Sequence, residues 1–167
     1  MRNVLRIRTF NVSAMSVEEL YREVILDHYR NPRRKGSLSG DVIHADGENP
    51  SCGDEFALDI IIEGDTITDA AIQGQGCSIS QASGSMMADA IVGKTIAQVD
   101  ALGKRFRLMM SIDEGESPVD PSRPGATLGD LEALQGVRQF PVRIKCADLP
   151  WTTLGAALAK AEAASTA

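Results

Sequence analysis

The 167-residue chain has little of several things that mark common protein classes. Its apolar runs fall well short of the roughly 20 residues that a helix needs to cross a bilayer, so the sequence predicts no membrane association. Lys and Arg number 17 against 23 Asp and Glu, which gives a net charge of −6. Binding to nucleic acid depends on clustered cations that release counterions. The shortage of positive charge therefore argues against nucleic acid as the main partner.

Cysteine is also scarce: there are three, an odd number, and we expect no secretory signal. A fully paired disulfide framework is excluded, and we expect a reducing compartment, the cytoplasm, where thiols bind metals or do chemistry. Only 4% of residues are aromatic, yet 43% are hydrophobic, enough for the core of one domain. We expect residues 1–14 to be a disordered extension and residues 15–167 to form that domain. Residues 111–136, rich in acid, Pro and Gly, are expected to be a surface loop.

The predicted elements follow the order helix, strands, then further helices. A helix begins after Ser16, which forms a capping box with Glu19. Alternating residues on both sides of Gly64-Asp65 predict an antiparallel hairpin, and residues 42–47 predict a third, short strand. The expected later segments are a helix after Cys77, two short helices starting at Thr95 and Asp100, an extended segment over residues 140–146 and a final helix. Strands kept apart from helices favour an α+β fold, a small three-stranded antiparallel sheet packed by helices.

Two cysteines lie at equal distances from the predicted turn: Cys52 is 12 residues before Gly64, and Cys77 is 12 residues after Asp65. An unbroken register with a two-residue loop would place them opposite each other, with Cβ atoms roughly 4.5–5.5 Å apart. Asp54 would share a face with Cys52, because strand side chains repeat every second residue. The sequence therefore predicts a metal site or a sulfur-handling site at the open end of the hairpin. The second strand alternates poorly, so a bulge would shift this register by one residue.

The third cysteine, Cys146, completes a set of four candidate metal ligands with Cys52, Asp54 and Cys77. Zn²⁺ prefers a tetrahedral site of thiolate, imidazole or carboxylate donors, and this set would supply one. The separations along the chain are unlike those of a zinc finger. Three unrelated cysteines, buried as small hydrophobic residues, are therefore the alternative.

Arg143 and Lys145 flank the third cysteine. In an extended segment, residues two positions apart project to the same side. Three thiolates and one carboxylate around Zn²⁺ carry a net negative charge, which a nearby cation would offset. We therefore expect Arg143 or Lys145 to support the charge of the site. The alternative is that both are solvated strand residues.

Four stretches of the chain carry further distinctive motifs. They are residues 21–35 (YREVILDHYRNPRRK), 49–54 (NPSCGD), 73–83 (QGQGCSISQAS) and 143–147 (RIKCA), with Trp151 beyond. Together, and in this order, they resemble the U-type proteins of iron–sulfur cluster assembly, which include IscU, the N-terminal domain of NifU and, most closely, SufU. The resemblance covers about residues 16–158. Lys145 in the place of a His, and an insertion at residues 111–136, favour the SufU branch over IscU.

The resemblance implies the SufE/NifU type of fold and Zn²⁺ bound by Cys52, Asp54, Cys77 and Cys146. It further implies a sulfurtransferase that stimulates a PLP-dependent cysteine desulfurase of the SufS type. Cys52 would accept persulfide sulfur from that enzyme and pass it toward a downstream iron–sulfur scaffold. The runner-up is an IscU-like scaffold that holds iron or a [2Fe–2S] cluster on the same residues, since thiolates serve both metals. A third alternative is an interaction module with a purely structural zinc.

Overall fold

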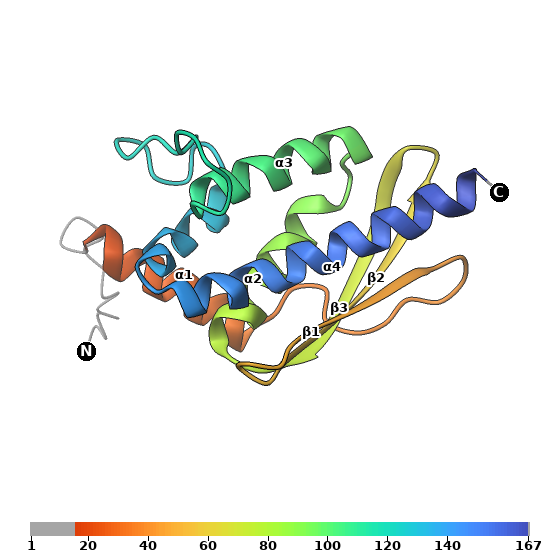
Figure 1. Cartoon of the computed structure of the whole chain (residues 1–167), viewed down its shortest axis with the longest axis horizontal. Coiled ribbons are helices and arrows are strands. Elements are labelled where there is room, and N and C mark those ends of the chain that lie inside the picture. The colour runs from red at the N-terminus through yellow and green to blue at the C-terminus, as the bar shows by residue number, and fades with distance from the viewer. Residues whose placement is uncertain (1–15, 167) are drawn as a thin grey trace, which may run out of the picture.

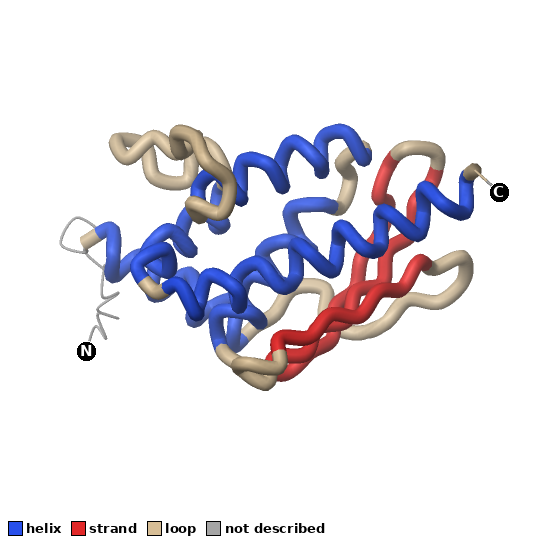
Figure 2. Tube along the Cα trace, in the orientation of Figure 1, coloured by secondary structure: helices blue, strands red, loops and turns tan. Residues whose placement is uncertain are grey.

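The computed structural model describes residues 16–166, so the extension expected at residues 1–14 lies outside the described residues. The three strands lie together in one region, and a long helix crosses them (Figure 2), which confirms the expected α+β fold. The elements in chain order are α1 (Val17–Arg30), β1 (Ile43–Asn49), β2 (Asp54–Glu63), β3 (Thr66–Gln75), α2 (Ser78–Ile91), α3 (Ile96–Met109), the 3₁₀ helix η2 (Gly129–Gln139) and α4 (Pro141–Ser165). Within residues 16–166, no helix is both long and apolar enough to pass through a bilayer.

The three strands form one antiparallel sheet in the order β1-β2-β3. Every second residue along most of β2 is buried, and Phe56, Leu58 and Ile60 belong to the hydrophobic core. Helices α2 and α4 contact this strand, and α4 runs across the sheet (Figure 1). The contact with α2 is close, because a Cβ added to Gly84 would lie 2.4 Å from the ring of Phe56.

The predicted register of the β2–β3 hairpin is wrong. A β-bulge in β3 lies opposite Ile61 and Ile62 of β2. The extra residue in β3 shifts the pairing by one position. Cys52 therefore does not lie opposite Cys77. Both cysteines also fall outside the strands, Cys52 in the turn before β2 and Cys77 at the N-cap of α2.

The expectation of two short helices after residue 94 is also wrong. Residues 96–109 form the single helix α3, whose N-cap is Thr95. The helix continues through Asp100 because Val99, Gly103 and Phe106 form an unbroken buried stripe along it.

The inserted segment is only partly a surface loop. Its first part, residues 111–127, consists of turns and bends with mostly exposed side chains, but η2 begins at Gly129 and packs against the core. The buried side chains of η2 are Leu131, Glu132, Ala133, Leu134 and Val137. The buried His28 of α1 anchors this helix, since its Nε2 lies 2.8 Å from Oδ2 of Asp130 and its Nδ1 lies 2.8 Å from Oγ of Ser85.

Candidate metal centre

Four different segments bring the candidate ligands to one end of the sheet. Cys52 lies in the turn between β1 and β2, and Asp54 is the first residue of β2. Cys77 is the N-cap of α2. Cys146 lies in the second turn of α4. The convergence is therefore a property of the whole fold, not of one hairpin.

The carboxylate of Asp54 is buried and held in a fixed orientation. Only 1% of the residue is exposed, and the backbone N–H of Cys77 donates to Asp54 Oδ1 over 2.8 Å. Gly76 allows this approach: its φ is +140°, and a Cβ there would lie 2.2 Å from the same oxygen. The second oxygen, Oδ2, accepts a hydrogen bond from Sγ of Cys77 over 3.7 Å.

Three ligand atoms form a compact group. The side-chain donors of Cys52, Asp54 and Cys146 all lie within 4.8 Å of one another, and the two sulfurs are 3.5 Å apart. Cys77 is not a member of that group, although its Sγ lies beside Asp54. Exposure differs among the cysteines: Cys52 is exposed, Cys77 intermediate and Cys146 buried. The deepest part of the site is therefore buried, and the sulfur of Cys52 is accessible.

The electrostatics of the group favour a cation. Burial raises the pKa of the Cys146 thiol well above its ordinary value, and hydrogen bonds with Asp54, Cys52 and Cys77 raise this pKa further. A thiolate at this position is costly because it would lie buried beside other negative groups. A divalent ion would remove that cost, and thiolate and carboxylate donors suit Zn²⁺ or iron. The donor set thus fits the expected metal.

Arg143 and Lys145 do not project to the same side, which corrects the sequence-based expectation. Residues 141–146 are helical, because Pro141 occupies the first turn of α4, where a missing N–H is tolerated. Two positions along a helix differ by about 200° in direction. Both cations are exposed, and the Arg143 guanidinium lies 5.2 Å from the centre of the Phe140 ring. Arg143 is three residues from Cys146, so these two share a helix face.

Sequence reasoning missed one polar neighbour of the site, Asn49. Its Nδ2 lies 3.9 Å from Sγ of Cys146, and its carbonyl oxygen accepts the N–H of Cys52 over 3.2 Å. The Asn49-Pro50 pair was a recognisable turn signal. Asn49 therefore shapes the turn that presents Cys52.

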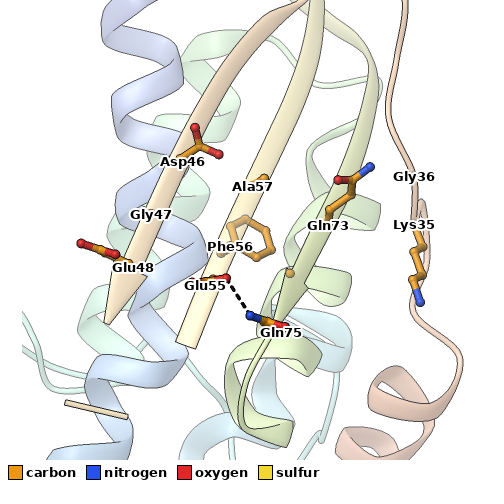
Figure 3. Close-up of a pocket in the computed structure, with 11 residues that line it drawn as sticks. Lys35, Gly36, Asp46, Gly47, Glu48, Glu55, Phe56, Ala57, Gln73 and Gln75 are labelled. Carbon is orange, nitrogen blue, oxygen red and sulfur yellow. Dashed lines mark hydrogen bonds between the residues drawn. The ribbon is translucent and has the colours of Figure 1, made fainter. Parts of the chain in front are cut away.

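A groove of about 860 Å³ lies on the exposed face of the sheet and is distinct from the cysteine group (Figure 3). Its polar lining includes the carboxylates of Asp46, Glu48 and Glu55 and the amides of Gln73 and Gln75. Gln75 Nε2 donates to Glu55 Oε2 over 2.8 Å. No cysteine lines this groove, so it offers no nucleophilic sulfur.

The fold and the cysteine group together define a small α+β protein with a cysteine-rich candidate metal centre. The chain belongs to the NifU-like N-terminal domain family, whose model matches residues 20–147. It is 47% identical over 147 residues to the zinc-dependent sulfurtransferase SufU of Bacillus subtilis (strain 168), covering 88% of this chain and 95% of that protein.

Two further matches agree with this assignment. The chain is 39% identical over 142 residues to the iron–sulfur cluster assembly scaffold protein IscU of Streptococcus pyogenes serotype M1, covering 85% of this chain and 84% of that protein. A crystal structure of a putative iron–sulfur cluster assembly scaffold protein for the SUF system, from Fervidobacterium islandicum AW-1, superposes with a TM-score of 0.72 and 34% identity. That match covers 86% of this chain and 99% of the other. The resemblance seen in the sequence motifs is thereby confirmed.

Proposed function

We propose that this protein is a zinc-dependent sulfur acceptor in iron–sulfur cluster assembly, which takes sulfur from a PLP-dependent cysteine desulfurase. One observation carries the proposal: the exposed Cys52 belongs to the same compact donor group as the buried Asp54 and Cys146. A purely structural site would bury all its donors. The 47% identity to a zinc-dependent sulfurtransferase supports the same activity.

The four residues would have different roles, which follow from how deeply each is buried. Cys52, Asp54, Cys77 and Cys146 would hold Zn²⁺, which when bound keeps thiols deprotonated and therefore nucleophilic. The three less exposed ligands would retain the ion, and Cys52 would meet the partner. Its thiolate would attack the outer sulfur of a persulfide on the desulfurase. A new S–S bond forms at Cys52 while the old one breaks, and the partner cysteine leaves as a thiolate.

The partner and the compartment follow from this chemistry. PLP would belong to the desulfurase, and the sulfur on Cys52 would pass to a downstream iron–sulfur scaffold. An exposed thiol that must stay reduced before transfer suits the cytoplasm.

The test begins with protein purified without reconstitution and analysed for bound metal. Cysteine desulfurase and cysteine are then added, alanine production is followed, and the acceptor is examined by mass spectrometry. We expect stoichiometric zinc, faster alanine production and a gain of about 32 Da on Cys52. A Cys52→Ala variant that still accepted sulfur and stimulated the desulfurase would remove Cys52 from this role.

Arg143 is proposed as the cation that supports the site, because it shares a helix face with Cys146. Lys145 provides a matched control, since it is also exposed but points in nearly the opposite direction from Arg143. We expect Arg143→Ala to weaken zinc binding or sulfur acceptance more than Lys145→Ala. Equal effects of the two substitutions would contradict a specific role for Arg143.

An assembly scaffold is the second candidate function, favoured by the 39% identity to an IscU protein. Thiolates bind iron–sulfur clusters as readily as zinc. A coloured protein that contains iron as purified would support the scaffold. Zinc without any effect on the desulfurase would support a structural module instead.

A further inference from the structure

We propose that Cys52 and Cys146 form a reversible disulfide in the metal-free protein. The two Sγ atoms lie 3.5 Å apart, and a disulfide brings sulfurs to about 2.05 Å. The sulfurs therefore need to approach by only about 1.5 Å. The regulatory meaning of this bond rests on the proposed function, but its formation depends only on the geometry of the two cysteines.

The surroundings of the two sulfurs allow this approach. Cys52 is exposed in a turn, and no atom lies within 4 Å of a Cβ added to the next residue, Gly53. Cys146 is buried on α4, which fixes its position. The turn can therefore adjust toward the helix without disturbing the core.

Cys77 is the less favourable partner for either sulfur. Its Sγ lies 3.7 Å from Oδ2 of Asp54, and it falls outside the donor group that unites Cys52 with Cys146. The hairpin register expected from the sequence would instead have paired Cys52 with Cys77. The β-bulge in β3 removes that alignment, so the structure selects Cys146 as the partner.

The oxidation balances with one equivalent of a peroxide. Hydrogen peroxide oxidises Cys52 by two electrons to a sulfenic acid, and one water is released. Sγ of Cys146 then attacks the Cys52 sulfur, the S–S bond forms and the S–O bond breaks. The leaving hydroxide takes the thiol proton of Cys146 as a second water. A dithiol reductant reverses the bond by thiol–disulfide exchange.

The disulfide would prevent both metal binding and sulfur acceptance at the site. It removes two of the four metal donors, one of which is the accessible sulfur. It also keeps Cys52 from further oxidation to sulfinic acid, which is not reversed by thiols. The protein would thus stop accepting sulfur under oxidative stress and recover when reduced.

The experiment treats the full chain, stripped of metal by a chelator, with one equivalent of hydrogen peroxide. The products are analysed by intact mass, by thiol titration and by mapping of the linked peptides. The same oxidation is run on the protein as purified, with released zinc followed by a chromophoric chelator, so that one sample starts with its metal bound. Cys77→Ser is the matched variant, because it retains both proposed partners.

We expect a mass loss of about 2 Da and a single Cys52–Cys146 linkage in both wild type and Cys77→Ser. Titratable thiols should fall from three to one in the wild type and from two to none in Cys77→Ser. Dithiothreitol should restore zinc binding. A linkage through Cys77, or Cys52 sulfinic acid beside an unchanged Cys146 thiol, would overturn the proposal. This experiment contains no desulfurase, so it tests the disulfide independently of the proposed function. A protein that forms the disulfide but accepts no sulfur in the desulfurase assay would refute only the proposed function.

Discussion

The substitution Gly76→Ala should damage the metal centre without changing any ligand. Gly76 has a φ of +140°, and an added Cβ would lie 2.2 Å from Oδ1 and 2.8 Å from Cα of Asp54. Since one of these atoms is backbone, a change of side-chain rotamer cannot relieve both contacts. Asp54 must move, and its hydrogen bond from the Cys77 N–H must lengthen or break.

Two costs combine in this variant. A non-glycine residue in this region of backbone space costs about 1–3 kcal/mol, and a lost hydrogen bond to a charged group costs about 1.5–3 kcal/mol. The free energy of unfolding of the zinc-loaded protein should therefore fall by about 2.5–6 kcal/mol. Displacing a carboxylate ligand should also weaken zinc binding by at least about 10- to 100-fold, the usual effect of disturbing the groups that orient metal ligands.

Gly53→Ala is the matched control, because Gly53 also has a positive φ, +69°, but has open space around its added Cβ. This variant should lose only about 1–2 kcal/mol of stability and keep close to the wild-type affinity for zinc. Urea unfolding and competition with a chromophoric chelator measure the two quantities. If both variants bound zinc equally well, the contact between Gly76 and Asp54 would not be what orients the carboxylate.

Three further predictions concern the fold around the site. Gly84→Ala should destabilise the protein by about 1–3 kcal/mol through overpacking against Phe56, whereas Gly155→Ala, exposed on α4 with no neighbour within 4 Å, should stabilise it by up to about 1 kcal/mol in urea unfolding. Hydrogen bonds to Asp59 and then Asp46 raise the pKa of His44 above 6.5, so its contribution to stability is complete below pH 6.5 and is lost as the pH rises through the folded-state pKa. His44→Gln should reduce this dependence of the free energy of unfolding on pH. An unchanged pH dependence would contradict this role of His44. Removal of zinc should lower the unfolding midpoint but leave the far-UV circular dichroism largely intact, because the buried core does not depend on the four ligands; complete unfolding would instead indicate a structural zinc.

The sequence predicted the elements that local signals define. Ser16 does cap α1, its Oγ accepting the N–H of Glu19 over 3.2 Å, and the hairpin turns at Gly64-Asp65 as expected. The register was not predictable in the same way. Ala70, Ala71 and Ile72 are buried in succession, so β3 carries no clean alternation that would fix the position of a bulge.

The surroundings of Cys146 could not be predicted because the start of α4 lacks a side-chain cap. Phe140 holds the N-cap position and makes no capping hydrogen bond, so only Pro141 marked the helix. The packed part of the insertion, by contrast, has a recognisable pattern of apolar residues in its sequence. Leu128, Leu131, Leu134 and Val137 recur every third residue and are buried, which is the period of a 3₁₀ helix.

The candidate ligands were identified from their residue types and motifs, although the geometric argument that paired Cys52 with Cys77 was wrong. The donors come from a turn, a strand, a helix N-cap and a second helix. Contacts between such distant segments depend on tertiary packing, and no single-hairpin register determines them. The family motifs instead put all four residues in one candidate set, and three of them, Cys52, Asp54 and Cys146, form one compact group in the structure.

X-ray absorption at the zinc edge tests the central claim most directly, since it counts the sulfur and oxygen atoms bound to the metal. We predict three sulfurs at about 2.3 Å and one oxygen at about 2.0–2.2 Å, with one sulfur fewer in Cys77→Ser. A first shell made only of nitrogen and oxygen, or a sulfur count unchanged by Cys77→Ser, would contradict the convergence of these four residues on one ion.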